Sequence, residues 1–423
     1  MRWVFGLAVL VASLIGVSRA DATPSPTLAI KHVWIITLEN ESADTTFGAS
    51  SPAHYLNDTL RKLGVFVPNY YGTGHVSLDN YIAMISGQGP NAATSSDCQF
   101  YTDVVPGTIG LDGQAYGVGC VYPPAVKTIA DQLDAKGLTW RGYEGDMGND
   151  PTREAATCAH PATNSQDHTQ SASATDSYAT RHNPFVYFHS IVDAPSCQTR
   201  VVPLPPLAND LQSAVSAPNF SFITPSLCDD GHDAPCADGR PGGLVSADAF
   251  LAKWVPLIMA SPAYKSAGMI VINFDEADVT KDASSCCGEQ PNPGGTPVPG
   301  VYGPGGGRTG AVVLSPFSAP GTTSNVAYNH YSLLRSVEDV FGVDHLGFAA
   351  ATGLVSFGAD IYSGRGAVPS ERPRSAAPTA PVVRATAEEL PRTGGRGPSL
   401  GLALFGVALV VVRGRRVARR DAA

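Results

Sequence analysis

HVWIITLEN, residues 32–40, is the stretch that decides the fold class. Its first seven residues form a short run dominated by apolar side chains, which is typical of a strand that is buried on both faces. Strands of this kind occur in parallel sheets that are covered by helices. Glu39 and Asn40 follow at the carboxyl end of the run, where ligands bind in sheets of this class. The stretch therefore predicts an α/β fold with a functional site at the end of its first strand.

Other segments of the chain extend this pattern. Three later apolar runs of strand length are NFSFITP (219–225), GMIVINF (268–274) and GAVVLSP (310–316). Helical patterns of apolar residues occur at 124–137, 246–261 and 331–342. Because strands and helices alternate along the chain, we expect a three-layer α/β/α sandwich with a mainly parallel central sheet.

The first 22 residues have the pattern of a secretory signal peptide. Arg2 precedes an apolar run from Val4 to Val17, and the small residues Ser18 and Ala20 follow at positions that suit cleavage. The alternative is a membrane anchor that is retained. With cleavage, a catalytic domain at 23–362 and a Pro- and Ala-rich linker at 363–389 would remain outside the cytoplasm.

Residues 390–423 contain three elements in a fixed order. The motif L-P-x-T-G is formed by Leu390, Pro391, Thr393 and Gly394, with Arg392 at the variable position. An apolar stretch from Leu400 to Val412 and an Arg-rich tail follow it. The three elements together resemble the sortase sorting signal of Gram-positive surface proteins. The resemblance implies that a sortase cleaves after Thr393 and attaches the chain to peptidoglycan; the alternative is a plain membrane tether.

Composition narrows the class of function. The chain has 37 acidic and 28 basic side chains, which argues against sequence-independent binding to nucleic acid. Eight cysteines in an exported chain favour disulfides, and no two pairs have the C-x-x-C spacing of a structural zinc site. Pairing between sequence neighbours would join Cys98 to Cys120, Cys158 to Cys197 and Cys228 to Cys236. The connectivity stays open at this point because spacing does not decide it.

Acidic clusters follow three of the predicted strands. Glu39 with Asn40 comes after the first, Asp275 with Glu276 comes after 268–274, and Asp229, Asp230, His232 and Asp233 come after 219–225. Neighbouring carboxylates repel one another and lose hydration energy on burial unless a cation or proton intervenes. Carboxylates combined with imidazoles suit a hard or borderline divalent ion. The clusters therefore predict a divalent metal site, against the alternative that each is a solvated loop.

Six separated motifs resemble one known family. They are ENESADTTFG (39–48), GHVSLDNYIAMISG (74–87), RHNPFVYF (181–188), ITPSLCDDGHD (223–233), FDEAD (274–278) and NHYSLLRSVEDVFG (329–342). Together they resemble the secreted phosphoesterases that include bacterial acid phosphatases and phospholipases C, within the alkaline phosphatase-like superfamily. The resemblance implies hydrolysis of phosphate esters by a Ser or Thr nucleophile that divalent metal assists.

Ser77 is the candidate nucleophile. It stands directly before a helix-like segment, and the unpaired N–H groups at a helix N-terminus favour a bound phosphate. The alternative is that Ser77 only caps this helix. Ser42, in the loop after the first strand, is the rival hydroxyl.

The resemblance also implies two sets of metal ligands and a second group of catalytic residues. Glu39 with Asn40, Asp275 and Glu276 would hold one metal ion. Asp230, His232 and His330 would hold a second, with Asp229 and Asp233 as competitors. The residues that could donate to phosphate or protonate the leaving group are His75, Asn80 and His182.

Four functions are compatible with these features. We expect a wall-anchored phosphatase that acts on small phosphate monoesters, with a phospholipase C that acts on phosphodiester lipids as the alternative. A catalytically silent adhesin or a structural wall protein would not need the acidic clusters and Ser77. The identity and number of the metal ions and the oligomeric state stay open.

Overall fold

The computed structural model describes residues 29–291 and 303–362. The predicted signal peptide (1–22), linker (363–389) and sorting signal (390–423) lie outside the described residues. Those three interpretations therefore remain predictions.

The central sheet has eight strands in the order β13-β2-β12-β11-β1-β10-β7-β9. The strands from β11 to β9 run parallel, and β12 is antiparallel to both β11 and β2. Their bounds are β1 His32–Leu38, β2 Val65–Val67, β7 Trp140–Glu144, β9 Val201–Pro203, β10 Phe220–Thr224, β11 Gly268–Phe274, β12 Ala311–Leu314 and β13 Thr322–Thr323. The predicted α/β class with a mainly parallel sheet is confirmed, and the apolar run at 310–316 supplies an antiparallel strand.

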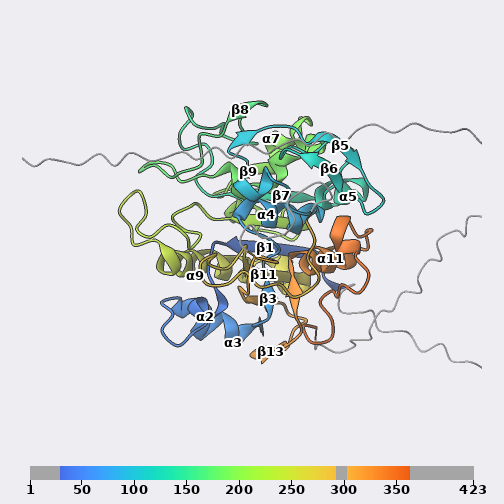
Figure 1. Ribbon diagram of the computed structural model, residues 1–423. Coiled ribbons are helices and arrows are strands. Elements are labelled where there is room, and N and C mark those ends of the chain that lie inside the picture. The colour runs from blue at the N-terminus through green and yellow to red at the C-terminus, as the bar shows by residue number, and fades with distance from the viewer. Residues whose placement is uncertain (1–28, 292–302, 363–423) are drawn as a thin grey trace, which may run out of the picture. The chain divides into compact units, whose positions relative to one another are not determined.

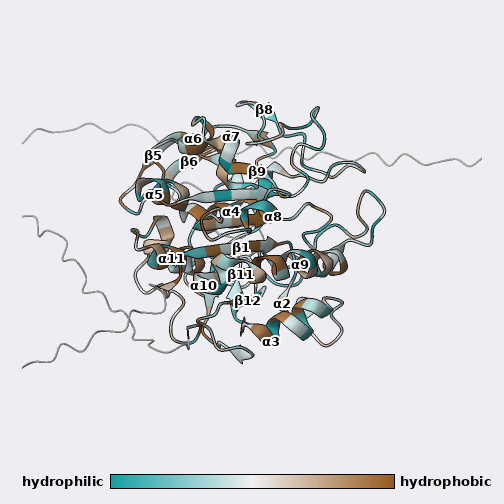
Figure 2. Cartoon of the chain, turned by 180° about the vertical axis from the view of Figure 1, so that it is seen from behind, coloured by the Kyte–Doolittle hydropathy of each residue, from teal (hydrophilic) through white to brown (hydrophobic). Residues whose placement is uncertain are grey.

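The two faces of the sheet carry separate hydrophobic cores. Alternate residues of β1 point to opposite faces, so Val33 and Ile35 pack into one core and Trp34 and Ile36 into the other. The first core is covered by α4 (Ser77–Ser86), α5 (Ile129–Ala135) and α11 (His330–Phe341), and the second by α9 (Gly243–Ala260) and α10 (Pro262–Ala267). Figure 2 shows α4 on one side of β1 and α10 on the other, and Figure 1 shows α4 and β1 from the opposite side. The predicted three layers are therefore present.

The ends of three helices differ by a few residues from the predicted ends. The predicted helix at 124–137 begins only at Ile129, because Thr128 and Asp131 form a capping box. The helix predicted at 246–261 begins earlier, at Gly243. The helix predicted at 331–342 ends at Phe341, and Gly342 follows it with a left-handed backbone (φ 62°).

Shorter elements connect the layers. The short helices are α2 Ala43–Thr46, η1 Leu56–Leu60, α3 Arg61–Leu63, η2 Thr94–Ser96, η3 Thr180–His182, η4 Pro184–Tyr187, α6 His189–Val192, α7 Cys197–Arg200, α8 Leu207–Asp210 and η5 Gly347–Ala350. The short strands are β3 Tyr70–Tyr71, β4 Phe100–Tyr101, β5 Val105–Ile109, β6 Ala115–Val118, β8 Ser165–Gln166 and β14 Tyr328–Asn329.

All eight cysteines form disulfides. The three pairings between sequence neighbours are confirmed: Cys98 with Cys120, Cys158 with Cys197, and Cys228 with Cys236. The adjacent residues Cys286 and Cys287 pair with each other. Disulfides of this density are typical of exported proteins.

Register brings the acidic clusters together at one edge of the sheet. Leu38 pairs with Phe274, so Glu39 and Asp275 leave the sheet side by side. The backbone N–H of Asp275 donates to the carbonyl of Leu38 (2.9 Å), and that of Glu39 donates to the carbonyl of Asp230 (2.9 Å). Three segments that are far apart in sequence therefore meet at the carboxyl ends of β1, β10 and β11.

Candidate active site

Ser77 is the first residue of α4 and is buried. Its hydroxyl Oγ donates to Glu39 Oε2 over 2.9 Å. Val76 occupies the N-cap position and its side chain forms no capping hydrogen bond, whereas Asp97 Oδ1 accepts from the backbone N–H of Leu78. The hydroxyl of Ser77 is therefore directed at the acidic cluster, and the alternative that Ser77 only caps the helix does not describe its contacts.

The loop before Ser77 is held by Asn80. Asn80 Oδ1 accepts hydrogen bonds from the backbone N–H groups of Thr73 (2.7 Å) and Gly74 (3.1 Å), and its Nδ2 donates to the carbonyl of Gly74 (3.0 Å). A Cβ atom at Gly74 would lie 2.4 Å from Asp79 Oδ1, so a larger residue there would require the Asp79 side chain to move. Asn80 was predicted to contact phosphate. Its contacts in the structure instead position the loop that precedes Ser77.

Glu39, His182 and Asp230 form a compact cluster whose ligand atoms all lie within 4.8 Å of one another. His182 Nε2 lies 3.3 Å from Glu39 Oε2, and His182 Nδ1 lies 3.7 Å from Asp230 Oδ2. All three side chains are at most 2% exposed. His182, which the sequence suggested as a phosphate or leaving-group contact, therefore lies among the candidate metal ligands.

Asp275 approaches this cluster from the end of β11. Its Oδ1 accepts a 3.0 Å hydrogen bond from the backbone N–H of Asn40. Asn40 has a left-handed backbone (φ 56°), which asparagine tolerates better than most residues, and this turn follows Glu39 directly. The turn at Asn40 therefore brings the ends of β1 and β11 into contact.

Several buried polar atoms in this region have no hydrogen-bond partner among the described residues. They are Asn40 Oδ1, Asp230 Oδ2, Asp275 Oδ2 and both ring nitrogens of His182. A buried polar atom without a partner costs about 1–3 kcal/mol, so a group of five is unfavourable unless a ligand satisfies them. Oxygen and imidazole atoms in this combination fit a divalent cation.

The pKa shifts of the clustered side chains also favour a bound divalent cation. Burial, then the charges of Asp275 and Asp230, raises the pKa of Glu39 well above its usual range. Burial raises the pKa of Asp230 well above its usual range and the pKa of Asp275 to about 7. Burial also holds the pKa of His182 well below its usual range, so the imidazole is neutral and can act as a ligand. A divalent cation would stabilise the ionised carboxylates that burial otherwise opposes.

Tyr81 supports the cluster from α4, one helical turn after Ser77. Its hydroxyl donates to Glu39 Oε1 over 2.5 Å, and its ring stacks on His182 with 5.1 Å between ring centroids. Sequence reasoning did not single out Tyr81, although its spacing of four residues from Ser77 places both on the same helix face. One helix therefore carries the candidate nucleophile and orients two candidate ligands.

Two predicted ligands have other contacts in the structure. Glu276 Oε2 contacts His75 Nδ1, whereas His75 Nε2 is buried without a partner among the described residues. The ring nitrogens of His330 lie 2.5 Å from the backbone carbonyl of Asp275 and 2.9 Å from the hydroxyl of Tyr70. His330 therefore holds the backbone at the end of β11, and its ring nitrogens are already occupied there.

The remaining candidates belong to the outer part of the 229–233 loop. His232 has a side chain that is 46% exposed, and its Nδ1 lies 3.1 Å from Asp233 Oδ1. Asp229 forms an ion pair with Arg240 (2.6 Å). The predicted grouping of Asp230 with His232 and His330 is thus replaced by the grouping of Asp230 with Glu39 and His182, because the loop turns His232 towards solvent.

Comparisons with known proteins point to one family. The model of the Phosphoesterase family matches residues 54–344. The phosphate-repressible acid phosphatase of Penicillium chrysogenum is 24% identical over 342 residues, which are 79% of this chain and 66% of that protein. The chain thus spans about two thirds of the length of this fungal relative.

Two further proteins are similar over most of the chain. The phosphatidylinositol-3-phosphatase of Mycobacterium tuberculosis is 24% identical over 349 residues, which are 81% of this chain and 89% of that protein. Among solved structures, a protein in the alkaline phosphatase superfamily from Vibrio parahaemolyticus aligns with a TM-score of 0.42 and 13% identity. That alignment covers 74% of this chain and 67% of the other.

Proposed function

The chain belongs to the Phosphoesterase family, and we propose that it hydrolyses phosphate monoesters through Ser77 with the assistance of divalent metal. The observation that carries this proposal is the 2.9 Å hydrogen bond from Ser77 Oγ to Glu39 Oε2. A serine that donates to a buried carboxylate within a cluster of candidate metal ligands has the arrangement of an activated nucleophile.

The residues that would hold the metal are Glu39, His182 and Asp230, whose ligand atoms lie within 4.8 Å of one another. Asn40 and Asp275 are further candidates, because each has a buried oxygen without a partner among the described residues. When bound, a divalent ion lowers the pKa of a hydroxyl group near it and stabilises negative charge on phosphoryl oxygens. Neither its identity nor the number of ions enters the proposal.

The protein's own residues supply the remaining chemistry. Ser77 Oγ forms a bond to phosphorus while the bond from phosphorus to the leaving oxygen breaks, and the serine proton passes to Glu39 Oε2. Glu39 Oε2 is the oxygen to which Ser77 Oγ already donates, so this proton has a short path to its acceptor. Water then hydrolyses the phosphoserine and restores Ser77. His75 lies two residues before Ser77, and its Nε2 has no partner within the part of the chain that the structure describes, so it remains a candidate for proton exchange with the leaving group.

The substrate class is a phosphate monoester, since the relatives from Penicillium chrysogenum and Mycobacterium tuberculosis are both named as phosphatases. The name of the second relative, a phosphatidylinositol-3-phosphatase, supports a lipid phosphate as one form of substrate. A phospholipase C that cleaves phosphodiester lipids remains the second candidate. The sequence patterns at the two ends support secretion and attachment of the enzyme to peptidoglycan by a sortase.

The test compares p-nitrophenyl phosphate with its phosphorylcholine diester, with and without a chelator. Loss of monoester hydrolysis on chelation, and its return with added divalent metal, would support the proposal. Preference for the diester would favour the phospholipase C. Hydrolysis that resists every chelator would exclude the metal-assisted mechanism.

A further inference from the structure

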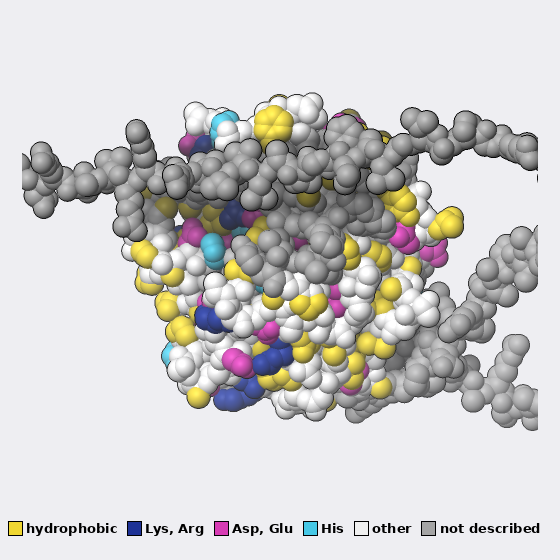
Figure 3. Space-filling model, viewed as in Figure 1, with side chains coloured by type: hydrophobic (Ala, Val, Ile, Leu, Met, Phe, Trp, Pro, Cys, Tyr) yellow, Lys and Arg dark blue, Asp and Glu magenta, His cyan; other side chains and the backbone are white. Residues whose placement is uncertain are grey.

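The hairpin formed by β5 and β6 has an unusual surface. Among the described residues, five of the twelve large hydrophobic side chains that are exposed lie within 105–118. They are Val105 (68% exposed), Ile109 (42%), Leu111 (110%), Tyr116 (37%) and Val118 (48%). Figure 3 shows hydrophobic side chains at the right-hand edge of the molecule, level with the label α5 of Figure 1, whereas grey atoms cover the place of the β5 and β6 labels. We call residues 105–118 the apolar hairpin.

Strand pairing places three of these side chains on one face of the hairpin, whereas Ile109, which pairs with Ala115, faces the other way. Val105 pairs with Val118, and Tyr116 lies two residues from Val118, so these three share one face of the hairpin. Leu111 lies in the turn and is fully exposed. The only charged residue of the apolar hairpin is Asp112. An exposed cluster of this kind marks an interaction surface.

The tip of the apolar hairpin is fixed to the protein. The turn is closed by a hydrogen bond from the Gly110 N–H to the Gln114 carbonyl (2.9 Å). Gln88 Nε2 donates to the carbonyl of Gly113 (2.8 Å), and Gln114 Nε2 donates to the carbonyl of Gly87 (2.9 Å). Gly87 directly follows α4, so the turn is tied to the end of the helix that begins with Ser77.

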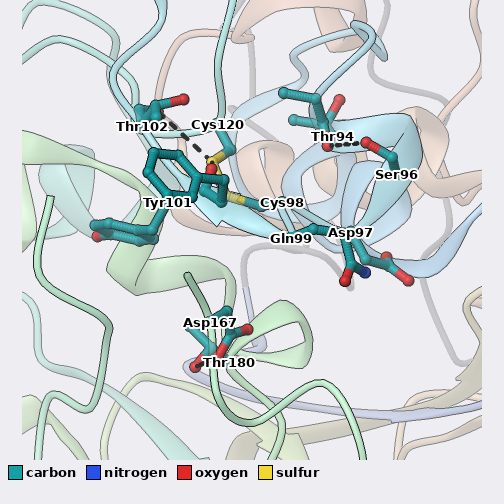
Figure 4. The surroundings of a disulfide bond; sticks show 12 residues. Thr94, Ser96, Asp97, Cys98, Gln99, Tyr101, Thr102, Cys120, Asp167 and Thr180 are labelled. Carbon is teal, nitrogen blue, oxygen red and sulfur yellow. Dashed lines mark hydrogen bonds between the residues drawn. A yellow bond between two sulfur atoms is a disulfide. The ribbon is translucent and has the colours of Figure 1, made fainter. Parts of the chain in front are cut away.

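The base of the apolar hairpin is fixed as well. Cys120, two residues after β6, is bound to Cys98 (Figure 4). Asp97, next to Cys98, accepts a 3.0 Å hydrogen bond from the backbone N–H of Leu78 in the first turn of α4. Both ends of the apolar hairpin therefore have a defined position relative to the helix that carries Ser77.

An apolar groove extends from the tip towards the start of α11. This groove of about 580 Å³ is lined by Leu111, Cys287, Tyr331, Phe348 and Leu354, among others. Tyr331 follows His330, whose ring contacts the carbonyl of Asp275. The groove thus connects the exposed tip with the helix that borders the candidate active site.

We propose that the apolar hairpin docks the protein on a lipid surface, with Leu111 inserted among the lipids. A single fully exposed leucine at a turn suits a fluid layer that can surround it, whereas a protein partner needs a broad complementary face. The hairpin has no Lys or Arg to attract anionic headgroups, so the partner is a zwitterionic surface and the binding is insensitive to salt. Docking does not depend on Ser77, so this inference is independent of the proposed hydrolysis.

The test uses the predicted mature chain, residues 23–393, which omits both apolar end segments, and phosphatidylcholine vesicles. We expect the protein to sediment with the vesicles and Leu111→Asp to weaken binding by about tenfold or more, because one buried leucine side chain is lost from the lipid. Val215 is 97% exposed outside the hairpin, so Val215→Asp is the matched control and leaves binding unchanged. Sodium chloride at 0.5–1 M, roughly a Debye length of 3–4 Å, leaves binding unchanged as well.

Equal binding by the Leu111→Asp and Val215→Asp proteins, or no sedimentation of the wild-type protein, would overturn the proposal. A wild-type dimer that Leu111→Asp converts to a monomer in light scattering would assign the hairpin to a second copy of the chain and would also overturn it. Because Leu111 is fully exposed, both variants are expected to keep the wild-type melting temperature and the wild-type rate of p-nitrophenyl phosphate hydrolysis.

Discussion

Ser77 Oγ donates a 2.9 Å hydrogen bond to Glu39 Oε2, and the two side chains come from different layers of the fold. Glu39 follows the central strand β1. Ser77 begins α4, which packs on the face of the sheet to which Val33 and Ile35 of β1 point. The contact therefore depends on the correct packing of α4 against β1. It joins the candidate nucleophile to the candidate metal ligands.

Replacement of Ser77 should remove catalysis and leave folding intact. We expect Ser77→Ala to lower kcat for p-nitrophenyl phosphate by at least ~10³-fold, because the attacking oxygen is lost. Ser42→Ala is the matched control, since Ser42 is a buried serine whose Oγ has no partner among the described residues. Steady-state kinetics and melting curves of both variants test this prediction. A Ser77→Ala protein with near wild-type kcat would contradict it.

Metal binding should stabilise the fold, because it satisfies buried carboxylates that repel one another. A divalent ion at about 100 times its Kd adds ~2.7 kcal/mol to the free energy of unfolding, and a chelator removes this gain. Asp230→Asn should lose most of the metal-dependent rise in Tm. In chelator, the same variant should melt at or above the wild-type temperature, because the folded state no longer contains a buried carboxyl whose ionisation burial opposes.

Asp278→Asn is the control for this experiment, since Asp278 forms an ion pair with Lys281 (2.7 Å) outside the cluster. It should keep the full metal-dependent rise in Tm. A wild-type Tm that does not respond to any divalent ion would count against the metal site.

Tyr81→Phe should weaken metal binding without unfolding the protein. The variant loses the hydroxyl that donates to Glu39 Oε1 but keeps the ring that stacks on His182. Loss of a hydrogen bond that orients a ligand typically costs 10–100-fold in metal affinity, so we expect about that increase in the metal concentration for half-maximal activity. Tyr178→Phe removes a buried hydroxyl that donates to a backbone carbonyl, and it should leave this concentration unchanged. Equal effects of both substitutions would refute the orienting role of Tyr81.

The stability of the protein should fall as pH rises, in part because of Glu338. Burial raises the pKa of this carboxyl to about 9, so the folded state keeps a proton that the unfolded state has released. In the unfolded state the pKa of this carboxyl is about 4.5. Its full contribution to the free energy of unfolding is present below that pH and is lost by ~1.4 kcal/mol per pH unit as pH rises towards 9. Glu338→Gln should therefore unfold at a higher denaturant concentration than wild type at pH 8, with the difference shrinking towards pH 5.

Asp339, the neighbouring residue, provides a control of opposite sign. Burial alone raises its pKa, but hydrogen bonds from His345 (3.0 Å) and Ser356 lower it overall. Its contribution is present above the unfolded pKa and lost as pH falls, so Asp339→Asn should destabilise the protein at pH 8. Denaturant titrations of both variants at pH 5 and pH 8 test the pair. A Glu338→Gln protein that is less stable than wild type at pH 8 would contradict the assigned protonation state.

The strands of the central sheet were predictable because their burial leaves a direct pattern in the sequence. The runs at 32–38 and 268–274 have the bounds of β1 and β11, since both strands are apolar almost throughout and are buried on both faces. The start of α5 was predicted too early, because an apolar stripe does not reveal where a capping box begins.

The candidate site was predictable only in part. The end of a buried strand can be read from the local sequence. Glu39, Asp230 and Asp275 each follow such a strand, so the sequence placed all three at the carboxyl edge of the sheet. The place of His182 between Glu39 and Asp230 depends on its packing against Tyr81, which no spacing in the sequence encodes. The contacts of His330 likewise follow from tertiary packing, since its ring meets the backbone of Asp275 rather than a carboxylate.

The most direct test of the account is to trap the phosphorylated enzyme. The protein is mixed with a phosphate monoester in the presence of divalent metal, quenched with acid within one turnover, digested and analysed by tandem mass spectrometry. We predict one phosphoryl group on Ser77 and none on Ser42, with the signal absent from the Ser77→Ala protein. A phosphoryl group on another residue, or a wild-type burst of product with Ser77 unmodified, would contradict the assignment of Ser77 as the nucleophile.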